Sequence, residues 1–278
     1  MLRKLQFLLV PIVLLAIIVY NPLAISQPGA NPHDPAHEDL CRIDYPSLDK
    51  IRWHAHFVRP EETLESLFGN DWTFVARFNR IDRRHVYPGM TIRVPDDMAA
   101  CRSYCPLPEQ YPAAEKHEKY ILIDLTEQWI GAYEYGELQF SAPAATGAPG
   151  HETPVGIYQI DARDETHSSS LYKTEDQTDQ YPMDNAMRFH VGADDVAYWI
   201  HARDLPGKPA SHGCVGLYDE AMQNRVYGTP KVPVLLDSEK FYQWAVGDEE
   251  YEDDPGDLEL IDDAPTVEVR GELPQYRK

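Results

Sequence analysis

The stretch WIHARDLPGKPASHGCVGLY, residues 199–218, contains two histidines, a serine and a cysteine within one short segment. The residues around its start, 197–200, are rich in aromatic and β-branched side chains, which predicts a buried strand that delivers His201 to a loop. Proline and glycine then turn the chain back toward Cys214. An imidazole can take the proton of a thiol and leave a nucleophilic thiolate. This stretch is therefore the candidate catalytic segment.

Gly213 precedes the cysteine and lacks a Cβ, so backbone N–H groups could gather around an oxyanion beside Cys214. Two other interpretations exist. A free cysteine is commonly a small buried hydrophobe, and His and Cys are also zinc ligands. The spacing from His201 through His212 to Cys214 matches none of the compact zinc patterns, so we expect no metal.

A histidine followed after a short loop by Ser-His-Gly-Cys resembles the catalytic motif of the L,D-transpeptidase family. Upstream, residues 146–158 are similar to the family's strand with a Thr-Pro-x-Gly turn. The resemblance defines a domain at residues 118–238. Two positions depart from the family pattern: Ala202 stands where many members have Gly, and Gly216 where many have Arg or Asn. The second departure affects a contact with a substrate carboxylate.

The resemblance implies a role for each residue of the motif. Cys214 is the expected nucleophile and His201 the expected base. His212 is expected to shape the oxyanion region beside Gly213, and Ser211 to position it by a hydrogen bond. The expected pocket residues are Tyr181, Met183, Arg188 and Trp199, of which Arg188 is suited to a carboxylate.

The reaction that the resemblance implies is L,D-transpeptidation of peptidoglycan, through a cysteine thioester formed on a stem peptide. It needs no cofactor, it would serve cell wall biogenesis and cell shape or attach a protein to the wall, and carbapenems are expected to inhibit it. Water could resolve the same acyl-enzyme, which would make the protein an L,D-carboxypeptidase or a hydrolase. Alternatively, Ala202 and Gly216 could mark a decayed site in a non-catalytic peptidoglycan-binding protein.

Short strands separated by turns, with little helix signal, predict a mainly β catalytic domain of the sandwich type. The polar segment 163–184 is too long for a tight turn and is either a binding loop or a disordered insertion. A short helix is predicted at 219–227, ending at Gly228, with its dipole near the nucleophile.

Residues 55–96 have the apolar pattern of a small β-α-α-β unit. This unit resembles a LysM domain, with residues 59–63 in place of the usual Pro-Gly-Asp-Thr entry. LysM domains hold glycan strands of cell walls, so the resemblance implies Thr63 and Asn79 as carbohydrate contacts. The alternative is that the unit is only a spacer or a docking surface, because a fold does not determine a function.

The first 26 residues have basic residues, an apolar run over Leu5–Val19, and small residues before position 27. This arrangement is typical of a secretory signal peptide, although the apolar stretch approaches the length of an uncleaved membrane anchor. Both alternatives place the remainder outside the cytoplasm, in the periplasm or cell envelope.

The remaining segments are assigned from composition. Residues 27–54 are predicted to be a polar lead-in, 97–117 a Cys/Pro-rich semi-rigid linker, and 239–278 a disordered acidic tail. A formal net charge of −21 argues against nucleic-acid binding.

Cysteine pairing stays open at this point. Cys41 could form a disulfide with Cys101 or Cys105, and the sequence does not choose between them.

Overall fold

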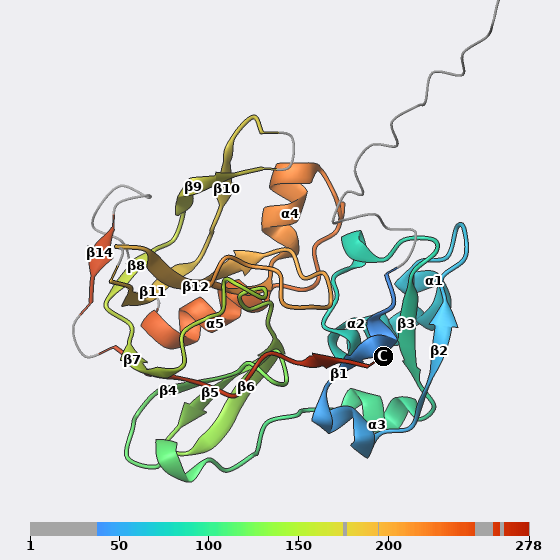
Figure 1. Cartoon of the computed structure of the whole chain (residues 1–278), viewed down its shortest axis with the longest axis horizontal. Coiled ribbons are helices and arrows are strands. Elements are labelled where there is room, and N and C mark those ends of the chain that lie inside the picture. The colour runs from blue at the N-terminus through green and yellow to red at the C-terminus, as the bar shows by residue number, and fades with distance from the viewer. Residues whose placement is uncertain (1–37, 175–176, 194, 248–257, 262–263, 278) are drawn as a thin grey trace, which may run out of the picture. The chain divides into compact units, whose positions relative to one another are not determined.

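The computed structural model of the chain describes residues 38–174, 177–193, 195–247, 258–261 and 264–277 (Figure 1). Residues 35–278 form one compact unit. The predicted export segment, residues 1–26, lies outside the described part of the chain. Within the described part, no helix combines the length and the apolar character needed to cross a membrane.

The segment that resembles a LysM domain contains two strands and two helices. They are β2 (Trp53–Phe57), α1 (Leu64–Phe68), α2 (Trp72–Asn79) and β3 (Thr91–Pro95), and β2 pairs antiparallel with β3. Thr63 caps α1, because its hydroxyl accepts a hydrogen bond from Ser66 N and its own N–H donates to the Ser66 hydroxyl. This reciprocal cap satisfies two donors at the helix start. Helix α3 (Met98–Arg102) follows.

Residues 38–54 pack into a core, although the sequence predicts a lead-in without one. Leu40, Tyr45 and Leu48 are buried in the same hydrophobic cluster as the apolar residues of α1 and α2. The prediction of a polar lead-in is therefore wrong from residue 38 onward. A few apolar side chains are enough to anchor this segment, because residues of α1 and α2 complete the hydrophobic cluster around them. We call residues 38–102 the N-terminal unit.

Two five-stranded sheets follow, and we call residues 118–277 the two-sheet unit (Figure 1). The first sheet has the order β6 (Glu137–Pro143), β5 (Trp129–Glu134), β4 (Tyr120–Asp124), β15 (Thr266–Arg270), β7 (Gly156–Gln159). The second has the order β13 (Val215–Tyr218), β12 (Ala197–Arg203), β11 (Ala186–Val191), β8 (Ala162–Asp164), β14 (Glu259–Leu260). A hairpin of β9 (Ser168–Lys173) and β10 (Gln180–Pro182) and the helices α4 (Glu220–Tyr227) and α5 (Asp237–Val246) complete it. The predicted mainly β architecture is confirmed.

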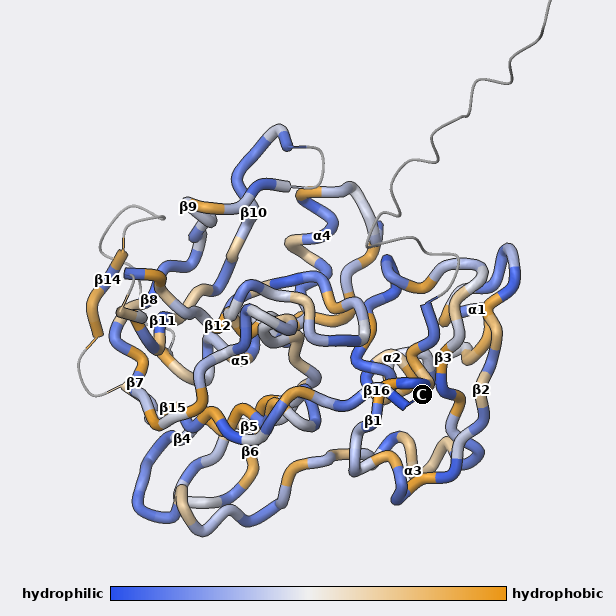
Figure 2. The backbone as a smooth tube through the Cα atoms, viewed as in Figure 1, coloured by the Kyte–Doolittle hydropathy of each residue, from blue (hydrophilic) through white to orange (hydrophobic). Residues whose placement is uncertain are grey.

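The two sheets share one hydrophobic core, to which α5 contributes. Ile123 of β4 and Val267 of β15 belong to the same buried cluster as Ile200 of β12 and Val215 of β13. Phe241 of α5 is also fully buried in it. Figure 2 shows hydrophobic stretches in strands of both sheets, for example at the label β5. The core thus joins strands that lie far apart in the sequence.

Strand β15 lies in the segment predicted to be a disordered acidic tail. It pairs in parallel with β4 and antiparallel with β7, so it lies inside the first sheet. Val267 and Val269 are buried in the core, and the intervening Glu268 accepts hydrogen bonds from the hydroxyls of Tyr111 and Tyr120, each at 2.7 Å. The prediction is wrong for this stretch, because acidic composition masked a strand that alternates apolar and polar residues.

The N-terminal unit and the two-sheet unit are not separate folds. Tyr218 of β13 belongs to the hydrophobic cluster of the N-terminal unit, and its hydroxyl donates to the carbonyl of Ile81 at 2.9 Å. Leu107 and Ala114, in the predicted semi-rigid linker, are buried. The prediction of a semi-rigid linker is wrong for these residues, because their side chains pack against β4 and β5.

All four cysteines are free thiols, so the expected disulfide from Cys41 to Cys101 or Cys105 is not formed. Burial raises the pKa of Cys41 to about 11 and that of Cys101 to about 12. Both thiols are therefore protonated at neutral pH and are poor nucleophiles.

The position of β15 predicts a stability difference between two apolar residues of the C-terminal segment. Val267→Ala should lower the free energy of unfolding by about 2 kcal/mol, because it leaves a cavity between the sheets. Leu258→Ala should change it by less than about 0.5 kcal/mol, since Leu258 is 49% exposed. Chemical denaturation of the two variants measures both values. Equal effects would contradict the placement of β15 in the core.

Candidate active site

Strands β12 and β13 carry the candidate site. They pair in parallel, with Ile200 opposite Val215 and His201 opposite Gly216. Successive side chains of a strand point to opposite faces. Ile200 and Val215 enter the core between the sheets, so His201 lies on the other face. Cys214 directly precedes Val215 and therefore lies on the face of His201.

A small cluster surrounds Cys214 on this face. Met183 and Trp199 are buried in it, and Tyr181 and Cys214 pack against them. Three residues that the sequence predicts for the substrate pocket, Tyr181, Met183 and Trp199, are thus brought to the cysteine.

Arg188, the fourth predicted pocket residue, has an acidic partner. Its Nε donates to Asp161 Oδ1 at 2.7 Å, while its guanidinium carbon lies 5.8 Å from the centroid of the Trp199 ring. Because Asp161 neutralises its charge, the geometry does not favour Arg188 as the partner of a substrate carboxylate.

His201 is held as a neutral imidazole with a defined tautomer. Its Nδ1 lies 2.6 Å from the carbonyl oxygen of Ala202. A carbonyl only accepts hydrogen bonds, so Nδ1 carries the proton and Nε2 keeps its lone pair. Burial, and then the nearby charge of Arg203, lower the pKa of His201 to about 3. An unprotonated Nε2 is the form that a general base requires.

The thiol of Cys214 is protonated in the resting site. Burial raises its pKa above the ordinary thiol value, while a backbone hydrogen bond from Trp199 and the charge of Arg203 act in the opposite direction. The resting pair is therefore a neutral thiol and a neutral imidazole. Proton transfer from Cys214 to His201 must accompany the attack on a substrate.

The loop before Cys214 is held by Ser211. The Ser211 hydroxyl donates to the carbonyl of Cys214 at 2.5 Å and accepts from Gly213 N at 3.0 Å. Ser211 therefore holds the backbone of Gly213 and Cys214, the segment expected to form the oxyanion region. Because Gly213 N–H already has a partner, the N–H of Cys214 is left as the candidate oxyanion donor in this segment.

Gly213 has a backbone conformation that favours glycine. Its φ is +118°, and a Cβ there would lie 2.6 Å from a carbon of the Tyr198 ring. The Thr153 hydroxyl donates to the Gly213 carbonyl at 2.8 Å and accepts from Gly147 N at 3.0 Å. The segment that resembles the family's Thr-Pro-x-Gly turn therefore positions the loop, a role for Thr153 that the sequence analysis did not assign.

His212 is exposed and lies at the mouth of the site. Its ring stacks on Tyr172 with centroids 4.1 Å apart and lies 4.7 Å from the ring of His151. Tyr172 belongs to β9, so most of the polar segment 163–184 is a hairpin whose first strand reaches the site. Partial burial, followed by the charges of His151 and Arg203, lowers the pKa of His212.

The predicted helix at 219–227 is confirmed as α4, with Asp219 as its N-cap and Gly228 at its end. The predicted effect of its dipole on Cys214 is wrong. Strand β13 (Val215–Tyr218) separates the helix from the cysteine, a distance of roughly 13 Å along an extended chain. A helix dipole acts mainly within its first turn.

The two residues predicted to bind carbohydrate, Asn79 and Thr63, differ in their exposure to solvent. Asn79 is fully buried; its amide nitrogen donates to the carbonyls of Val75 and Arg93, and its oxygen accepts from Arg93 N. The prediction that Asn79 contacts sugar is wrong, because its polar atoms hold α2 against β3. Thr63 is exposed, and its carbohydrate contact stays a prediction.

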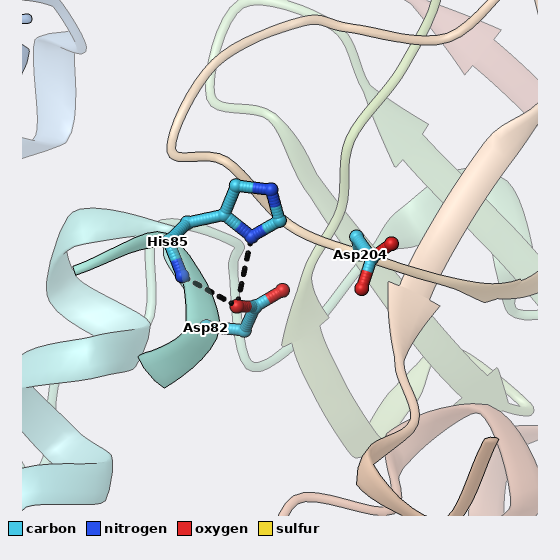
Figure 3. Close-up of side chains that lie close together, drawn as sticks. All are labelled: Asp82, His85 and Asp204. Atoms are coloured by element: carbon cyan, nitrogen blue, oxygen red, sulfur yellow. Dashed lines mark hydrogen bonds and ion pairs between the residues drawn. The ribbon is translucent and has the colours of Figure 1, made fainter. Parts of the chain in front are cut away.

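Asp82, His85 and Asp204 form a cluster between the N-terminal unit and the two-sheet unit, with possible metal-ligand atoms within 4.8 Å of one another (Figure 3). Their carboxylates already accept hydrogen bonds from the chain. Asp82 binds the ring of His85 at 2.9 Å and Gln223 at 2.8 Å. Asp204 binds Gln223 at 2.7 Å and the guanidinium of Arg84 at 2.8 Å. This guanidinium supplies the positive charge that a metal would bring. The cluster is therefore a hydrogen-bonded contact that links the N-terminal unit to the two-sheet unit.

The comparison with protein families agrees with the site. Residues 118–234, which include His201 and Cys214, match the family described as the L,D-transpeptidase catalytic domain (YkuD). This part of the chain is similar to L,D-transpeptidase catalytic domains. The match ends before β15, which completes one of the two sheets. A search of curated proteins found no match.

Several solved structures are similar to the chain. The L,D-transpeptidase (Yku) from Stackebrandtia nassauensis is 21% identical, with 74% of this chain and 69% of that chain covered and a TM-score of 0.39. L,D-transpeptidase 3 from Mycobacterium tuberculosis, in complex with a faropenem-derived adduct, is 20% identical, with 55% and 60% covered and a TM-score of 0.35. The chain thus spans less than two thirds of the second protein.

The protonation states of His201 and Cys214 predict a pH dependence. The rate of Cys214 alkylation by iodoacetamide should rise continuously from about pH 7 to pH 9, because the raised pKa of the thiol leaves little thiolate at neutral pH. No step is expected near pH 6.5, since His201 stays unprotonated down to about pH 3. Mass spectrometry of the labelled Cys214 peptide measures the rate. A plateau beginning below about pH 6 would instead indicate a thiolate–imidazolium pair.

Proposed function

We propose that the protein is a cysteine acyltransferase that cross-links peptidoglycan stem peptides, or attaches a protein to them, as an L,D-transpeptidase. The observation that carries the proposal is the placement of His201, with an unprotonated Nε2, on the same face of paired strands as Cys214. Both residues lie inside the matched catalytic domain.

In the proposed first step, His201 Nε2 accepts the thiol proton while the sulfur of Cys214 attacks the carbonyl carbon of the donor peptide bond. The backbone N–H of Cys214 stabilises the oxyanion. The tetrahedral intermediate then collapses, the C–N bond breaks, and the leaving amine takes the proton from His201. The product is a thioester, and the family resemblance implies that the leaving residue is a terminal D-alanine attached to a diaminopimelate centre.

In the second step, an amine of a neighbouring stem attacks the thioester. Its proton passes to His201 Nε2, the C–S bond breaks, and the sulfur recovers a proton from His201. Tyr181, Met183 and Trp199 line the region beside Cys214 and would contact the donor stem. Their apolar surfaces keep water from the thioester, which favours an amine acceptor over hydrolysis.

We further propose that residues 55–96 of the N-terminal unit form a LysM domain that holds glycan strands, and that residues 1–26 direct the protein to the periplasm or cell envelope. The strand-helix-helix-strand order supports the first proposal. Because the unit packs directly on the catalytic domain, bound glycan would be held close to the catalytic residues.

Incubation of the full chain with disaccharide tetrapeptide tests the reaction. A transpeptidase should produce cross-linked dimers and free D-alanine, which mass spectrometry resolves. Tripeptide without dimer would show that water is the acceptor and that the protein is a carboxypeptidase. An unchanged substrate, with folded protein, would contradict catalysis and favour a wall-binding role.

Acylation by a carbapenem tests the assigned roles without a wall substrate. Cys214→Ala should abolish the mass increase. His201→Ala should slow acylation by about a thousandfold, because the general base is lost. His212→Ala should slow it by only about tenfold, because the exposed ring adds at most one contact to the transition state. A larger loss for His212→Ala than for His201→Ala would reverse the assignment.

A further inference from the structure

Arg203 lies on the same strand face as the catalytic pair. It follows His201 by two residues in β12, so strand alternation directs both side chains to one side of the sheet. Gly216 of β13 pairs with His201 on this side. A Cβ on Gly216 would lie 2.4 Å from both Cβ and Cδ of Arg203. The stem of Arg203 therefore crosses the place that a side chain at position 216 would occupy.

The guanidinium of Arg203 has no carboxylate within ion-pair distance among the residues that the structure describes. Its Nη2 donates to the carbonyl of Ala210 at 2.9 Å, and its central carbon lies 5.6 Å from the centroid of the Tyr181 ring. Its Nε is buried without a hydrogen-bond partner. Arg188 differs, since Asp161 holds its Nε at 2.7 Å. Arg203 thus retains a positive charge and a buried donor at the site.

The position of Arg203 relative to His201 indicates which part of a substrate it meets. Cys214 must reach the carbonyl carbon of the scissile bond, and His201 must deliver a proton to the leaving nitrogen. The stem of Arg203 lies over Gly216, the strand partner of His201. Since His201 faces the leaving nitrogen, the guanidinium of Arg203 is placed near the leaving group. In a terminal amino acid, one carbon separates the nitrogen from the carboxylate. An arginine is suited to bind such a carboxylate through two hydrogen bonds.

We propose that Arg203 binds the terminal α-carboxylate of the leaving residue and restricts the donor to stems whose scissile bond is the last peptide bond. This inference rests on the proposed acyl transfer and specifies its donor. Gly216 contributes to the proposed carboxylate site, because the absence of its side chain lets the stem of Arg203 occupy this position. The charge of Arg203 also lowers the pKa of both His201 and Cys214.

Alkylation of Cys214 tests the anion site independently of the proposed reaction. Iodoacetate carries a carboxylate and iodoacetamide does not, so the ratio of their rates at Cys214 reports a nearby positive charge. Arg203→Gln should lower this ratio by about tenfold relative to the wild type. The matched control Arg225→Gln, which removes an exposed guanidinium paired with Asp184, should leave it unchanged. Added salt should lower the ratio in the wild type but not in Arg203→Gln.

Two further variants keep the test decisive if Arg203→Gln folds poorly. Arg203→Lys retains the charge and should keep most of the preference. Gly216→Ala retains the arginine but displaces its stem, so the ratio should fall. An unchanged ratio in Arg203→Gln or Gly216→Ala would overturn the proposal, and a loss confined to Arg188→Gln would assign the contact to Arg188 instead.

A second experiment compares the rates at which the protein uses disaccharide tetrapeptide and its C-terminal amide. The wild type should use the free acid with a higher kcat/KM, and Arg203→Gln should lose this preference mainly through the KM of the acid. If the wild type acts on neither substrate but retains the alkylation preference, the proposed reaction fails while the anion site stands. If it acts equally on both, the role of Arg203 in donor choice is wrong.

Discussion

The parallel pairing of β12 with β13 is the constraint on which the candidate active site depends. It brings His201 of β12 close to Cys214, which directly precedes β13, and strand alternation directs both side chains to one face. The opposite face anchors both strands in the core through Ile200 and Val215. A shift of one residue in this register would turn one strand over relative to the other and separate His201 from Cys214. The packing of the sheets therefore also enforces the geometry of the chemistry.

Buried ion pairs join the N-terminal unit to the two-sheet unit. Arg83 binds both carboxylate oxygens of the buried Glu220 at 2.7 and 2.6 Å, and Arg77 binds the buried Asp237 at 2.5 Å. A buried carboxylate that loses its cation is strongly destabilising. The two-sheet unit thus contains acids whose partners belong to the N-terminal unit, and the two parts are interdependent in stability.

Residues that belong to a local sequence motif could be predicted from the sequence. His201 and Cys214 belong to a motif, and the mainly β class follows from short strands separated by turns. Strand β15 was missed because its acidic surroundings outweighed the alternation of Val267 and Val269. The burial of Asn79 could not be predicted, since its partners in β3 lie many residues away. Arg203 could have been placed on the face of His201 by alternation, but its position over Gly216 requires knowledge of which strands pair.

Strand β15 also has a kinetic consequence. It pairs with β4 through Thr266 and Tyr120, which are 146 residues apart in the chain. Contacts between such distant residues must overcome a large loop-closure entropy and slow the folding reaction. During translation, β4 leaves the ribosome long before the strand that covers one of its edges. The nascent chain therefore exposes an apolar strand edge that is prone to intermolecular pairing until β15 has been synthesised.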